Sequence, residues 1–196
     1  MAKDIEEKRI RAAAEKRKIG SWILIGLLGI LLLIGLGYRF GMIGMIGIPK
    51  ASIVTDIRKS QKVPESWTTA GETGKHLAAY VSYPEETAEN EGYILSLYCT
   101  REGLSAGWHF RFGGGSSHVK DGIIYGQVAD KTEELAYFSL NKIKAVKAVL
   151  YPGTDKEEIR EIDPTKPFAM VIPGKAAPVF YDASGEELTC VGPAIY

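Results

Sequence analysis

The chain has 196 residues, with 24 Lys and Arg balanced by 24 Asp and Glu, so its formal net charge at pH 7 is zero. The first 18 residues hold seven of the bases and four of the acids, and Arg39 is a further base, which leaves residues 40–196 with 16 bases against 20 acids. A surface that binds duplex nucleic acid is expected to carry a basic patch, so this mildly acidic region argues against such a partner. The roughly 130 residues after Val63 suffice for one domain with its own core and not for two.

One apolar run, Ile19–Tyr38, is the dominant feature of the N-terminal part. A helix over residues 20–38 would be roughly 28 Å long, about the thickness of one hydrocarbon core. Trp22 lies near one end of it, and Arg39 follows at the point where a charge can reach the headgroup layer. We predict a transmembrane helix over residues 19–48, with its core at 20–38 and a glycine-rich extension, in a lipid bilayer.

The basic stub, residues 1–18, predicts the orientation of this helix. By the positive-inside rule its excess of Lys and Arg places the N-terminus in the cytoplasm and the C-terminal domain outside the plasma membrane. A cleaved signal peptide is the main alternative, but its apolar region would be about 7 to 15 residues long and would precede a small-residue cleavage site, which the sequence does not show. We therefore expect an uncleaved single-pass anchor.

Glycines recur at close spacing around the end of the predicted span, at Gly37, Gly41, Gly44 and Gly47. Small residues at such spacing let two helices approach closely, so these four could form a self-association or partner surface. Glycine is also common in membrane helices without such a role, and the sequence leaves both interpretations open.

The remainder predicts a polar juxtamembrane linker over residues 49–70, with room for a short helical stalk, and a β-sandwich-like antiparallel extracytoplasmic domain over 71–196. From His76 onward, short β-rich runs alternate with turn residues every eight to twelve positions, which is typical of a sandwich or barrel. The predicted strands are 77–83, 93–100, 107–113, 122–128, 135–140, 145–151, 157–162, 168–172, 178–181 and 187–191.

Alternation along the strand predicted at 107–113 assigns its side chains to two faces. Trp108, Phe110 and Phe112 would point into the core, while His109 and Arg111 would be solvated. Together with His118, the two polar residues of this strand are candidate surface contacts.

Two cysteines, Cys99 and Cys190, are both predicted to point inward. A disulfide between them would close a loop of about 90 residues and stabilise the domain by roughly 4 to 5 kcal/mol. Two separate buried thiols are equally compatible with inward orientation, because that orientation does not bring the sulfur atoms within bonding distance.

No catalytic, metal or cofactor motif stands out. The glycines before Ser116 could cradle an anion, but the Lys-Ser/Thr pair and the helix of a phosphate loop are missing, so a plain connection between strands is favoured. Ser117, His118 and Asp121 lie together, whereas a catalytic triad collects its members from separate rigid elements. The histidines, carboxylates and thiols show no metal-ligand spacing, so we expect neither a metal nor a cofactor.

The outer domain nevertheless carries an ordered series of short blocks. They are Gly103-Leu104-Ser105-Ala106-Gly107-Trp108-His109-Phe110-Arg111 with Gly113–Ser116, Ser139-Leu140-Asn141-Lys142, Ile162-Asp163, Lys166-Pro167-Phe168-Ala169, and Phe180-Tyr181-Asp182 with Gly185. The series resembles that of uncharacterised single-span membrane proteins of Gram-positive, clostridia-like bacteria, over roughly residues 92–188. The resemblance implies a bacterial plasma-membrane setting and an anchored β-domain, and it implies no activity.

Three functions remain open on the sequence alone. The first is a membrane-anchored extracytoplasmic binding module that contacts an envelope component or another membrane protein. The second is a cell-envelope hydrolase that uses His109 or His118 with a nearby hydroxyl or Cys99. The third is an accessory or sensory subunit of a membrane complex, which would need a partner helix because the stub is too short to fold into an output domain.

Overall fold

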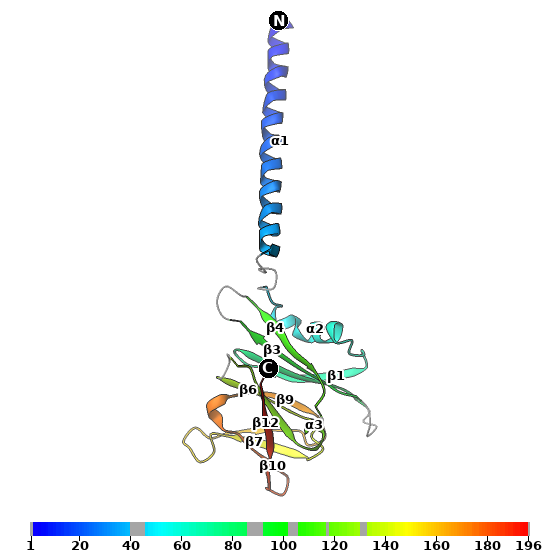
Figure 1. The fold of residues 1–196 in the computed structure, drawn as a ribbon, viewed down its shortest axis with the longest axis vertical. Coiled ribbons are helices and arrows are strands. Elements are labelled where there is room, and N and C mark those ends of the chain that lie inside the picture. Colours follow the sequence, from blue (N-terminus) through cyan, green and yellow to red (C-terminus); the bar gives the residue numbers. More distant parts are fainter. Residues whose placement is uncertain are drawn as a thin grey trace. The chain divides into compact units, whose positions relative to one another are not determined.

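The computed structural model describes residues 2–39, 46–85, 92–101, 106–116, 118–129 and 133–195. The chain divides into two compact units, residues 1–46 and residues 47–196. In the first unit, α1 (Ala2–Arg39) is one unbroken helix that contains both the basic stub and the apolar run (Figure 1). Its stretch Lys18–Leu36 has a mean hydropathy of 2.5 and is long and apolar enough to cross a membrane.

The second unit is mainly antiparallel β-structure in three four-stranded sheets. The first sheet is a meander in chain order, of β1 (Trp67–Thr73), β2 (Leu77–Pro84), β3 (Ile94–Thr100) and β4 (Trp108–Gly114). The second has the order β12 (Cys190–Ile195), β5 (Ile123–Gln127), β6 (Glu134–Ser139) and β9 (Phe168–Pro173), with β12 parallel to β5. The third has the order β11 (Glu187–Leu188), β10 (Val179–Asp182), β7 (Ala145–Leu150) and β8 (Glu158–Glu161). Short helical segments are α2 (Ile53–Ser60), α3 (His118–Asp121) and the 3-10 turns Lys50–Ser52 and Gly174–Ala176.

Three clusters of buried side chains define the order of the layers. The first cluster fills the space between the first and second sheets, where Leu97 and Phe138 are buried. The second fills the space between the second and third sheets, with Tyr137 and Phe180 at its centre. The third lies between α2 and the outer face of the first sheet. The second sheet is therefore buried on both faces, which explains why β6 and β9 carry runs of apolar residues rather than strict alternation.

This architecture confirms the predicted fold class, an N-terminal apolar helix followed by a mainly-β antiparallel domain. Each predicted strand lies within one residue of its expected bounds except the last. The stretch predicted at 187–191 is divided at Thr189 into β11 and β12, which belong to different sheets. The third sheet adds a layer that a two-sheet sandwich does not have.

The predicted linker, residues 49–70, contains a short helix as expected, but the range belongs to the folded unit, so its assignment as a linker is wrong. Ile53 and Ile57 are four residues apart on α2, face the same side, and are 0% exposed in the third cluster. The carboxylate of Asp56 accepts a hydrogen bond of 2.7 Å from the hydroxyl of Tyr98 on β3. A helix with its apolar side buried and a side-chain bond to the sheet is a structural part of the domain, and β1 takes up the last four residues of the range.

A β-bulge in β4 overturns the expected faces of that strand. The pairing with β3 shifts by one residue at Arg111, so the alternation of the strand is reversed beyond it. Trp108 and His109 are 8% and 9% exposed, Phe110 is 48% exposed, and Phe112 packs against the first cluster on the opposite face. His109 is thus buried rather than solvated, whereas Arg111 is exposed as predicted.

The four glycines proposed for helix contact do not share one element. Gly37 lies in α1, Gly41 and Gly44 lie outside the described residues, and Gly47 belongs to the β unit. A Cβ atom at Gly47 would lie 2.5 Å from the carbonyl oxygen of Trp108, so glycine is needed there for close approach to β4. The proposal of a helix contact at Gly47 is therefore wrong.

Candidate functional site

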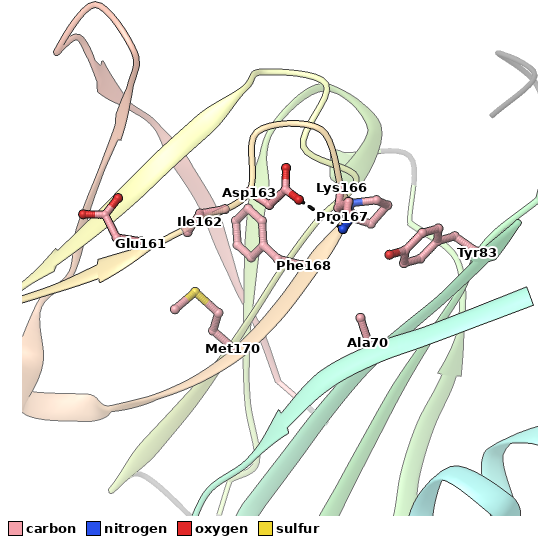
Figure 2. A pocket seen from close by; sticks show the side chains of 9 residues that line it. All are labelled: Ala70, Tyr83, Glu161, Ile162, Asp163, Lys166, Pro167, Phe168 and Met170. Atoms are coloured by element: carbon pink, nitrogen blue, oxygen red, sulfur yellow. Dashed lines mark ion pairs between the residues drawn. The ribbon is translucent and has the colours of Figure 1, made fainter. Parts of the chain in front are cut away.

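A groove lies where the edges of the first and second sheets come together. Its volume is about 230 Å³, and it continues into a neighbouring hollow of about 470 Å³ that shares Tyr83, Lys166 and Pro167 with it. In Figure 2, Ala70 and Tyr83 border one side of the groove, and the β8–β9 connection with the start of β9 borders the other. The site is thus assembled from strands that are far apart in sequence.

Apolar groups dominate the floor of the groove. The lining side chains of this kind are Ala70, Ile162, Pro167, Phe168 and Met170. These side chains belong to two different parts of the core. Ala70 packs against the first cluster, on one face of the second sheet, and Met170 packs against the second cluster, on its other face. An apolar floor with a few polar groups is the usual composition of a ligand site.

Tyr83 brings the main polar group of the wall. The residue is 8% exposed, and burial raises the pKa of its phenol above the ordinary value. The hydroxyl therefore stays protonated at physiological pH and can donate one hydrogen bond and accept others.

Charged side chains lie around the rim. Lys166 forms an ion pair with Asp163 at 3.2 Å (Figure 2), and Asp163 also accepts hydrogen bonds from the hydroxyl and the backbone N–H of Thr165. Those bonds from Thr165 lower the pKa of Asp163, and the Lys166 ammonium acts in the same direction. The Glu85 carboxylate accepts a hydrogen bond of 2.8 Å from Thr68 on β1. The rim therefore presents fixed charges of both signs.

A polar cluster closes one end of the space between β1 and β9. The backbone N–H of Val171 donates to the Glu72 carboxylate at 3.0 Å, and the Val171 carbonyl accepts from Arg160 at 3.4 Å. Arg160 also pairs with Glu72 at 3.2 Å. Both backbone groups of Val171 thus point away from β6, so β9 has an outward edge at this position. Because backbone direction repeats every two residues along a strand, the N–H and C=O of Ala169 face the same edge, but this residue is only 5% exposed and does not line the groove.

A second group of chemically interesting side chains gathers on β3 and β4. His109 is the cross-strand partner of Cys99, and the Nε of Arg111 lies 3.0 Å from the Cys99 sulfur. Burial lowers the pKa of His109, and the nearby Arg101 and Arg111 lower it further, so its imidazole is neutral at pH 7. Cys99 itself is 0% exposed within the first cluster, where a substrate has no access to its sulfur.

The remaining predicted residues do not assemble with this group. Cys190 packs partly buried in the second cluster and is a free thiol like Cys99, so the structure contains no disulfide between them. Burial raises the pKa of Cys190 to about 11. His118 is exposed on the four-residue helix α3. Among the residues that the structure describes, no group of His, Cys, Asp or Glu is arranged to hold a metal ion.

The glycine-rich segment after β4 forms ordinary structure rather than an anion cradle. Gly113 and Gly114 are the last residues of β4. The N–H of Ser116 donates to the Tyr93 hydroxyl at 3.0 Å, and that hydroxyl donates to the Ser116 carbonyl at 2.5 Å. The N–H of Ser116 is therefore already paired.

Sequence reasoning missed the groove because its residues carry no local signal. Tyr83 and Lys166 are ordinary strand-end and loop residues, and only the topology brings them together. The fold and the groove define the class of this chain as a β domain with an open, mostly apolar cleft, preceded by an apolar helix. No protein family, no curated protein and no solved structure matches the chain.

Proposed function

We propose that this protein is a membrane-anchored extracytoplasmic binding module that takes an extended peptide segment of an envelope or membrane protein in its groove. The observation that carries the proposal is the groove itself, which has an apolar floor and a rim of hydroxyl and charged groups. A groove of this kind can hold an extended segment whose alternate side chains enter the two neighbouring hollows.

The membrane part of the proposal rests on α1. Its side chains between Ile19 and Leu36 are 42% to 72% exposed where they are large and apolar, and a contiguous apolar surface of this kind is covered by lipid or by protein in a stable state. The basic stub favours a cytoplasmic N-terminus and an outer β domain. The resemblance to single-span proteins of clostridia-like bacteria agrees with this arrangement.

The peptide class follows from the geometry of the site. An apolar side chain fits between Tyr83 and Phe168, and the peptide backbone would lie along the β8–β9 connection at Lys166 and Pro167, which line both hollows. Lys166 and Glu85 lie at the rim, where they can interact with charged side chains of the bound segment.

Selection from a random peptide library against the full chain in nanodiscs tests this function. Bound peptides should protect the amides of residues 162–170 from hydrogen exchange, and Ala70→Arg, which fills the groove, should abolish binding. Lys175→Glu, an exposed change in the 3-10 turn after β9, is the matched control and should leave binding intact. If the selected peptides bind Ala70→Arg as well as the parent chain, or if none is enriched, the proposal fails.

A cysteine hydrolase is a second candidate, favoured by the position of His109 opposite Cys99 and by Arg111 beside the sulfur. A nucleophilic cysteine works with a neighbouring base, and His109 would be that base here. The candidate requires that Cys99 become accessible in the folded protein. Rapid alkylation of Cys99 by iodoacetamide under native conditions would favour it, and alkylation only after unfolding would remove it.

A further inference from the structure

A group of bases clusters on and around α2, close in sequence to the apolar helix. Lys50, Lys59 and Lys62 are exposed and Arg58 is half-buried, and these four residues are called the α2 basic face. Arg58 and Lys59 lie in the last turn of α2, where positive side chains interact favourably with the negative end of the helix dipole, so their presence there has a structural reason. The helix dipole does not explain Lys50 and Lys62, which lie outside the helix.

The charge of the β unit is unevenly distributed along the chain. Residues 47–65 hold four bases and two acids, whereas residues 66–196 hold 12 bases and 18 acids. One of the two acids, Asp56, accepts a hydrogen bond from the buried Tyr98 and is turned toward the sheet. The segment that carries α2 is therefore the positive part of a unit whose remaining sequence is negative.

A shallow hollow of about 590 Å³ lies on this positive side, lined by Thr55, Arg58, Lys59, Val63 and Glu65. The Arg58 guanidinium donates to the carbonyl oxygens of Glu65 and of the first residue of β1, at 3.2 and 3.0 Å, which fixes its position. A guanidinium has five N–H donors, so others remain to bind an anionic oxygen. The hollow thus combines a positioned donor with the exposed ammonium of Lys59, beside the side chain of Glu65.

Chain length allows this side to reach a bilayer. Only residues 40–46 separate Arg39, the last residue of α1, from Gly47, the first residue of the β unit. Even fully extended, that stretch spans at most about 28 Å. The domain is therefore held near any membrane that α1 crosses.

We infer that the α2 basic face binds the head groups of anionic lipids in the bilayer that holds α1. This rests on the anchoring role proposed for α1. Each base near an anionic surface contributes roughly a fivefold increase in the ratio of docked to undocked domain. The contact would fix the orientation of the domain and direct the acidic sheets away from lipid.

Energy transfer in nanodiscs tests the inference on the full chain. A donor dye is attached at Thr55→Cys in a chain with Cys190→Ser, since Cys99 is buried, and the acceptor is a head-group-labelled lipid. A second donor position, Lys175→Cys, lies in the exposed turn after β9, next to Ala176, which packs on the side of the second sheet away from α2. Transfer from residue 55 should exceed that from residue 175 when phosphatidylglycerol makes up about one-third of the lipid. The difference should vanish in pure phosphatidylcholine and at about 1 M salt, where the Debye length is about 3 Å.

Charge reversal provides the matched variants. Lys59→Glu with Lys62→Glu should lower the docked ratio by at least about 25-fold, whereas Lys142→Glu with Lys156→Glu, both exposed elsewhere, should not. Equal energy transfer from residues 55 and 175, or an equal fall of the docked ratio in both double variants, would overturn the lipid contact of the α2 basic face. Neither result would contradict the membrane anchor. A chain that fails to insert into nanodiscs at all would overturn the anchor as well.

Discussion

The substitution Ile57→Ala shortens one buried side chain of α2. It tests whether residues 49–62 are a structural part of the β domain. Ile57 is 0% exposed and packs in the third cluster with Tyr98 and Trp108. The change removes three carbon atoms from a buried position, which costs about 2.4 kcal/mol in transfer free energy at about 0.8 kcal/mol for each group. The cavity left behind adds to this, so we expect a total loss of about 3 kcal/mol, within the usual range for such changes.

Thermal unfolding of the full chain in detergent micelles, followed by tryptophan fluorescence, measures the effect. For a domain of this size, about 3 kcal/mol corresponds to a fall in Tm of roughly 6 to 12 °C. Thr55→Ala, an exposed change on the same helix, is the control and should alter stability by less than about 0.5 kcal/mol. If Ile57→Ala unfolds at the same temperature as the parent chain, α2 does not pack as described and residues 49–70 are a linker after all.

Three further predictions concern the interior of the β domain. Asn141→Ala should lower the free energy of unfolding, measured by urea denaturation, by about 2 to 4 kcal/mol. The buried Asn141 side-chain amide forms hydrogen bonds with three backbone groups, and its φ of 56° is a left-handed conformation that alanine disfavours. The substitution Lys142→Ala, at an exposed neighbouring position, is the control and should have little effect. The pKa of His109 is lowered in the folded state, so its contribution to stability is present above about pH 6.5, the ordinary value, and is lost as the pH falls through the lower folded pKa. His109→Gln should therefore flatten the dependence of the urea midpoint between about pH 7.5 and 5, and an unchanged slope would contradict the assignment. Under denaturing conditions without reductant, both Cys99 and Cys190 should be alkylated, and a resistant pair would reveal a disulfide.

Much of the β domain could be predicted because its strands are short, apolar and separated by turn residues. The stretch 168–172, for example, combines β-formers with prolines before and after it, and β9 lies there. β1 was missed because its sequence, Trp-Thr-Thr-Ala-Gly-Glu-Thr, has few apolar residues, and all of them are only partly buried or exposed. An edge strand of this kind is stabilised by its hydrogen bonds to β2, and its own sequence shows no clear alternation of apolar and polar residues.

The errors of detail have a common physical origin in non-local contacts. The bulge at Arg111 inserts one residue into β4, and nothing within the strand sequence shows that the pairing with β3 shifts there. α2 is a two-turn amphipathic helix whose burial depends on a sheet formed later in the chain. The groove is a similar case, because Tyr83 and Lys166 are neighbours only once the first and second sheets have packed.

The most direct test of the whole account is the location and length of the mature protein in cells. Membranes washed with alkaline carbonate should retain the intact chain of 21.4 kDa, and protease added to intact cells should remove the β domain, residues 47–196, while sparing the N-terminal stub. Recovery of the intact chain in the soluble fraction, or of a shorter chain that begins beyond Leu36 in the medium, would contradict the anchor and the function proposed on it.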